Sequence, residues 1–97
     1  MSELRLAVKR EYFEQIKSGK KTEEYRLANE YWSRRLLTRD APYDRVIITL
    51  GYPSKNQTDR ILTFPYAGFW LKTITHKHFG VEPVEVFAIV LKRDPLF

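Results

Sequence analysis

Apolar side chains follow two different periods at the start of the chain. Leu4, Leu6 and Val8 alternate with more polar neighbours, which predicts a strand with one buried face. The segment Glu11–Ser18 instead gathers its apolar side chains on one side of a helix. Gly19 follows at the place where a left-handed C-terminal cap is expected. The chain therefore begins with a strand and a short helix.

The later segments predict a second strand–helix pair and then four strands. Asn29 is a suitable N-cap for the second helix, and the β-branched run Arg45–Leu50 indicates a central, well-buried strand. The other predicted elements are a strand at Lys21–Leu27, a helix at Glu30–Leu37, and strands at Arg60–Phe64, Phe69–Thr75 and Val84–Lys92. Loops are expected at Thr38–Tyr43, Gly51–Asp59, Pro65–Gly68 and His76–Pro83. This order predicts an α+β fold, a mixed β-barrel of about five to six strands with two short helices.

Composition limits the class of protein. The 97 residues have the size of one domain, 1–97, and the 43% hydrophobic content is enough for one core. The absence of cysteine excludes disulfides, thiolate nucleophiles and zinc fingers. No secretory signal peptide is predicted, and the longest apolar stretch falls far below the ~20 residues of a membrane span. We expect a cytoplasmic protein without a membrane or cofactor partner.

The charge balance points to polyanionic partners. The formal net charge is +5, which favours RNA or another single-stranded nucleic acid. Tyr31 and Trp32 lie beside Arg34 and Arg35 in the second predicted helix, and aromatic rings with arginines suit base stacking and phosphate contact. Trp32 is expected to pack this helix onto the barrel, and the two arginines are either solvated or form a phosphate-contact patch.

The segment from Gly19 to Arg26 carries the clearest chemical signal. It reads GKKTEEYR and fits the pattern G-x-K-x-x-E-x-R. Glu24 and Arg26 are two residues apart on a strand and so point to the same face, with Lys21 at the mouth of that strand. Because buried charges are costly without partners, the face is either exposed to solvent or lines a polar pocket.

This arrangement resembles the ASCH domain, a member of the PUA-like β-barrel superfamily. The resemblance covers the octet, the preceding strand and helix, and the order of the remaining elements. It implies an RNA-binding fold in which Lys21, Glu24 and Arg26 face a cleft and Gly19 shapes its rim. Lys9, at the end of the first strand, is expected to stand close to them.

The resemblance also implies that the cleft is catalytic in some members. One group removes the acetyl group from acetylated cytidine with a lysine that matches Lys21, a threonine that matches position 24 and a glutamate from a later strand. Here Glu24 replaces that threonine and cannot act as the same hydroxyl nucleophile. Thr22 is expected to face the opposite side of the strand from Glu24. Glu82 and Glu85 are the candidates for the later glutamate. If the protein is an enzyme, Lys21 and Glu24 are the expected catalytic residues.

The two histidines and the loop after Gly51 are less informative about function. His76 and His78 lack a third ligand nearby, so no metal site is predicted, although His76 would suit a general acid or base beside a cleft. The polar loop Tyr52–Gln57 is either a pocket cover or an ordinary exposed loop. Three functions therefore stay open: an RNA-binding module that recognises a single or modified base, a small hydrolase of modified nucleosides or RNA, and a regulatory module for a nucleoside-like ligand.

Overall fold

The computed structural model describes residues 2–37 and 43–92, whose strands form two three-stranded sheets. In the first sheet β3 (Arg45–Leu50) lies between β1 (Glu3–Val8) and β4 (Ile61–Pro65). β1 runs parallel to β3, and β4 runs antiparallel to it. The central position of β3 confirms the expectation from its β-branched sequence, and four of its six residues are buried.

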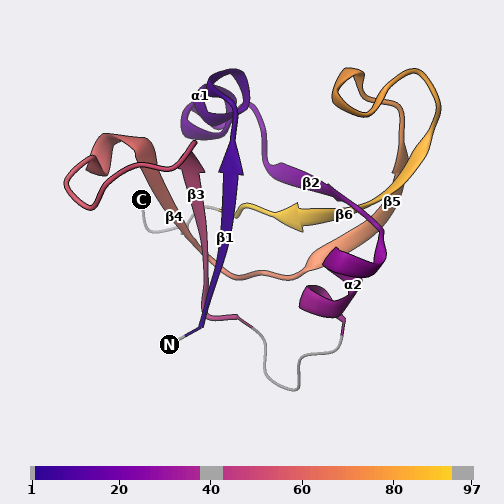
Figure 1. Cartoon of the computed structure of the whole chain (residues 1–97), viewed down its shortest axis with the longest axis horizontal. Helices are drawn as coiled ribbons and strands as arrows, with labels where there is room; N and C mark the ends of the chain where they lie inside the picture. The colour runs from indigo at the N-terminus through magenta and orange to yellow at the C-terminus, as the bar shows by residue number, and fades with distance from the viewer. Residues whose placement is uncertain (1, 38–42, 93–97) are drawn as a thin grey trace.

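The second sheet is antiparallel throughout. β6 (Val84–Val90) lies between β2 (Glu23–Leu27) and β5 (Phe69–Ile74). Figure 1 shows the strands of this sheet crossing the direction of the first at a steep angle. Both sheets contribute to one apolar core, to which β1 supplies Leu4 and Leu6, and β6 supplies Phe87 and Ile89.

Two helices complete the expected α+β class, which the structure confirms. α1 (Arg10–Ser18) buries Phe13 and Ile16 and lies at the end of β1 and β3 (Figure 1). It ends at Gly19, whose φ of 87° is the left-handed conformation that glycine adopts without strain. α2 (Glu30–Leu36) begins after Asn29, whose side chain accepts a hydrogen bond from the Trp32 backbone N–H at 3.0 Å, as an N-cap should.

Several element boundaries differ from the expected ones. The strand expected from Lys21 begins at Glu23, because the Lys21 N–H bonds the Gln15 carbonyl at the end of α1. Two short 3₁₀ helices, η1 (Thr58–Arg60) and η2 (Lys77–Phe79), lie mostly within segments predicted as loops. η1 also includes Arg60, which was predicted to begin a strand. Of the predicted loop Thr38–Tyr43, residues 38–42 lie outside the described residues.

The described strands form two sheets and not a continuous ring, so closure into a barrel stays a prediction. β1 and β2 are both outer strands of their sheets, and no strand ladder joins them in the described residues. Arg26 of the octet reaches across from β2 to β1, where its guanidinium donates to the Ala7 carbonyl. No helix within the described ranges is long and apolar enough to cross a membrane.

Candidate functional site

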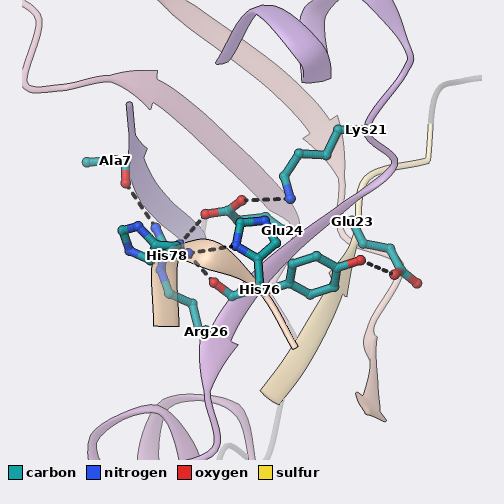
Figure 2. Close-up of polar contacts among 8 residues, drawn as sticks. Ala7, Lys21, Glu23, Glu24, Arg26, His76 and His78 are labelled. Carbon is teal, nitrogen blue, oxygen red and sulfur yellow. Dashed lines mark hydrogen bonds and ion pairs between the residues drawn. The ribbon is translucent and has the colours of Figure 1, made fainter. Parts of the chain in front are cut away.

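A carboxylate held between two cations forms the centre of the candidate site. Glu24 is only 5% exposed, although it carries a charge. Its Oε1 lies 3.6 Å from the Lys21 Nζ, and its Oε2 forms an ion pair and hydrogen bond with the Arg26 guanidinium. Figure 2 shows Glu24 between these two cations. The alternation of β2 brings Glu24 and Arg26 to one face, as the sequence predicted.

Arg26 connects the two sheets through its side chain. Its Nη2 donates to the backbone carbonyl of Ala7 on β1 at 3.0 Å, and its Nη1 donates to the Tyr25 carbonyl at 3.1 Å as well as to Glu24. A guanidinium has five N–H donors, so most of this one is already engaged within the protein. Arg26 therefore orients Glu24 and spans the gap between the β1 and β2 edges, with little left to donate to a ligand.

Lys21 is the cation with donors to spare. Its side chain is 12% exposed, and its distance to Glu24 exceeds that of a normal hydrogen bond. The ammonium lies 4.3 Å from the ring centroid of Tyr25 and 5.5 Å from that of Tyr12. Burial lowers the pKa of Lys21 below its ordinary 10.5, and this outweighs the opposing attraction of Glu24.

These side chains face a cavity of about 300 Å³ between the ends of the two sheets, which we call the cationic cavity. This volume is at the lower end of the range of about 300–1,000 Å³ typical of small-molecule sites. The cationic cavity is lined by Ala7, Val8, Lys9, Tyr12, Lys21, Glu24, Tyr25, Arg26, Gly51, Tyr52, His76, His78 and Phe79.

Aromatic rings form one wall of the cationic cavity. The His76 ring lies 5.6 Å from Tyr12, 6.2 Å from Tyr25 and 6.0 Å from Phe79, measured between centroids. The His78 ring adds an edge-on contact with Phe79 at 5.1 Å. These rings come from α1, β2 and the segment around η2, so they meet only in the folded chain. Flat faces of this kind suit a planar ring as ligand.

His76 is held in one tautomer. Its Nδ1 accepts a hydrogen bond from the His78 backbone N–H at 3.1 Å (Figure 2), so in the neutral ring the proton is on Nε2. Burial, and then the positive charge of Lys21, lowers the pKa of His76 below 6.5. A neutral His76 can therefore donate a hydrogen bond from Nε2 at neutral pH. The ion pair between Lys77 and Glu11 at 2.7 Å ties its segment to α1.

The structure brings together four of the residues expected in the cleft: Lys9, Lys21, Glu24 and Arg26 all line the cationic cavity. Gly19 does not line it and acts instead by ending α1. Arg34 and Arg35 lie on the exposed side of α2, outside the cationic cavity. Arg34 pairs with Glu30 at 2.6 Å, and the Arg35 guanidinium stacks 3.6 Å from the ring centroid of Tyr31.

Of the deacetylase-like set, Lys21 and Glu24 line the cationic cavity, but the remaining candidates do not. Thr22 is exposed and borders a different hollow. Glu82 lies before β6 and Glu85 lies near its start; both are exposed, and neither lines the cationic cavity. Within residues 2–37 and 43–92, no three His, Asp or Glu side chains are placed so that they could hold a metal ion.

The sequence did not indicate the aromatic wall. From the sequence, His76 suits an acid or base beside a cleft, but nothing in the sequence places Tyr12, Tyr25 and Phe79 in a shared cavity. The available signal was the aromatic and histidine content of His76–Phe79, which is unusual for a simple solvent-exposed turn.

Comparison with known proteins adds no relative from which roles could be transferred. No known protein family matches the chain, and no curated protein or solved structure matches it significantly. Roles are therefore assigned from the geometry and chemistry of these residues.

Proposed function

We propose that the chain is an RNA-binding module of the ASCH type whose cationic cavity receives one base, standard or modified, of a single strand. One observation carries the proposal: a buried Glu24, paired with the partly buried Lys21 and Arg26, lines a cavity with an aromatic wall. Aromatic faces stack on any base, and the polar set can then read the edge of that base.

The polar groups have complementary hydrogen-bonding capacity for a base edge. The Lys21 ammonium donates to a ring carbonyl, which is the group that uracil and cytosine present. A carboxylate oxygen accepts two hydrogen bonds, so Glu24 can take one from an exocyclic amino group while it remains paired with Arg26. His76 adds a donor through Nε2. This combination favours a base that carries both a carbonyl and an amino group.

The surrounding charge supports a nucleic acid over a neutral ligand. The net charge is +5, and Lys9 is exposed at the rim of the cationic cavity, where it can contact a phosphate. The same proposal includes closure of the two sheets into a PUA-like barrel across the β1–β2 gap. It also includes a cytoplasmic location. The two facing sheets with a charged gap between their edges support that architecture.

Fluorescence anisotropy of a labelled single-stranded RNA octamer of random sequence tests the proposal. We expect Lys21→Met to weaken binding about 10-fold or more, because it removes a charge-assisted hydrogen bond. Lys20→Met is the matched control, since Lys20 carries the same charge next along the chain but is exposed and does not line the cationic cavity.

Equal affinities of the two variants would place the RNA away from the cationic cavity. No binding by the wild-type protein at low salt would refute RNA recognition. In that case, binding of a free nucleoside would favour the regulatory module.

Hydrolysis of a modified nucleoside is a second candidate, favoured by the lowered pKa of Lys21 beside a buried carboxylate. Lys21 would act as a base or stabilise a developing negative charge, and Glu24 would move a proton. Mass spectrometry of a panel of acylated and methylated nucleosides tests it. More than one equivalent of product per protein, lost in Lys21→Met, would establish turnover; no product from any substrate would reject it.

A further inference from the structure

A second hollow of about 370 Å³ adjoins the cationic cavity on the side of α2; we call it the lateral groove. The two hollows share Ala7, Arg26, Gly51 and Tyr52 as lining residues. Arg26 and Ala7, which are joined by a hydrogen bond, therefore border both hollows. A ligand that enters the cationic cavity can therefore continue into the lateral groove without leaving the protein surface.

The lateral groove presents aromatic rings that are largely exposed to solvent. Tyr52 is 96% exposed and Tyr31 is 53% exposed, and both line the lateral groove. Trp32 lies beside Tyr31 with its ring centroid 5.1 Å away, and packs partly onto the core. Exposed aromatic rings at neighbouring positions are the stacking platforms that single-stranded nucleic acids use.

Positive charge accompanies these rings. Arg5 lies on the β1 side of the lateral groove with its side chain 66% exposed, and its Glu3 partner is 3.6 Å away. Arg35 stacks on Tyr31 from the α2 side. Exposed ion pairs of this length contribute little and exchange readily, so Arg5 can turn to a phosphate.

Another hollow on the opposite side of Lys21 is a poorer continuation. It contains the exposed Trp70 and the exposed Lys92, but it shares only Lys21 with the cationic cavity, and Glu23 lies in its lining. We therefore expect a bound nucleic-acid strand to continue from the cationic cavity toward α2.

We propose that the lateral groove binds the nucleotide adjacent to the one whose base enters the cationic cavity. The ligand is then a single-stranded oligonucleotide, and a free nucleoside fills only half of the site. The adjacent base stacks on Tyr31 or Tyr52, and the intervening phosphate meets Arg5. This inference rests on the proposed function, because it assumes that a base occupies the cationic cavity.

The test compares binding of the labelled RNA octamer with binding of the four 5′-mononucleotides. Fluorescence anisotropy measures octamer binding, and NMR chemical shifts of the protein measure mononucleotide binding. Arg5→Gln should weaken octamer binding and reduce the slope of log K against log salt by about 0.7, the value for one lost phosphate contact on a single strand. Arg10→Gln is the matched control, because its side chain is also 66% exposed and lies 3.9 Å from a glutamate.

Tyr31→Ala should weaken octamer binding about 5- to 150-fold by removal of a stacking face. Trp70→Ala, which removes an exposed ring elsewhere, should leave it unchanged. Mononucleotide binding should be unaffected by Tyr31→Ala, because no adjacent base is present, and lost in Lys21→Met. That pattern supports the lateral groove as a second nucleotide site.

Two other outcomes overturn the inference in distinguishable ways. If the octamer binds but Arg5→Gln and Tyr31→Ala match their controls, the lateral groove is not part of the RNA path, and the cationic cavity proposal stands. If neither the octamer nor any mononucleotide binds the wild-type protein, the proposed function fails and the inference fails with it. Because Arg5 is exposed, its variant tests the site even if Tyr31→Ala disturbs α2.

Discussion

Replacing Glu24 by glutamine removes the negative charge that lies between Lys21 and Arg26. The glutamine keeps the shape and can still accept a hydrogen bond from Arg26. Two cations then remain within a largely buried site, where their side chains are 12% and 19% exposed, with no counter-charge between them. Removing one partner of a buried ion pair typically costs about 3–5 kcal/mol.

The partial exposure of both cations places the expected loss in the free energy of unfolding at about 2–4 kcal/mol. This is a large fraction of the roughly 5–15 kcal/mol that stabilises a domain of this size. Removing Lys21 instead has a different effect. Burial of its ammonium outweighs its attraction to Glu24, as its lowered pKa shows, and the Glu24–Arg26 pair survives. Lys21→Met should therefore stay within about 1 kcal/mol of the wild type.

Urea denaturation followed by circular dichroism measures both variants under the same conditions. Glu24→Gln should be the more destabilised of the two by at least about 1 kcal/mol. The double variant Glu24→Gln/Lys21→Met should recover part of the loss, because one of the two unpaired cations is gone. If Lys21→Met is as destabilised as Glu24→Gln, the ammonium contributes to the fold, and its assignment as the ligand-binding cation is wrong.

Lys21, Asn29 and Gly19 each make a contact or adopt a conformation whose effect can be measured by substitution. RNA binding should decline as the pH rises toward the ordinary lysine pKa of about 10.4, and at a lower pH than an ordinary lysine would cause, because the lowered pKa of Lys21 makes the ammonium lose its charge sooner. Lys21→Arg should abolish this decline in anisotropy titrations. Asn29→Ala should lower the unfolding free energy by about 1 kcal/mol through loss of the cap on the Trp32 N–H, and Asn29→Ser should restore most of it. Gly19→Ala should cost about 1–2 kcal/mol, because alanine is strained at a φ of 87°. Thermal unfolding measures the last two, and no change in either would contradict the cap assignments.

Local patterns were sufficient to predict most elements. The bounds predicted for strand β3, Arg45–Leu50, are those observed. Its β-branched run is followed by Gly51, which marks the end of the strand. The Asn29 cap and the Gly19 cap were also predicted correctly, because both depend only on neighbouring residues. The face shared by Glu24 and Arg26 followed from strand alternation alone.

Long-range relations were harder to predict. The pattern gave strands but not their partners, so the separation into two sheets, with β3 and β6 at their centres, came from the structure. The aromatic wall required Tyr12 and the His76–Phe79 segment to meet, although they are far apart in the chain. η2 has no periodic signal, since it spans three residues held by a local turn. The role of Arg26 as a bridge to Ala7 depends on this same distant packing.

The bridge between Arg26 and Ala7 also bears on how the molecule behaves at high concentration. An outer strand exposes carbonyl and N–H groups that an extended segment of another chain can pair with, and this is a common route to aggregation. The Ala7 carbonyl is one such group on the outer edge of β1, and the Arg26 guanidinium already occupies it. The side chain of Arg26 lies across this part of the edge, so a foreign strand that paired with β1 at Ala7 would have to displace it. The residue that holds Glu24 in place for a ligand thus also protects this point of the β1 edge from edge-to-edge pairing.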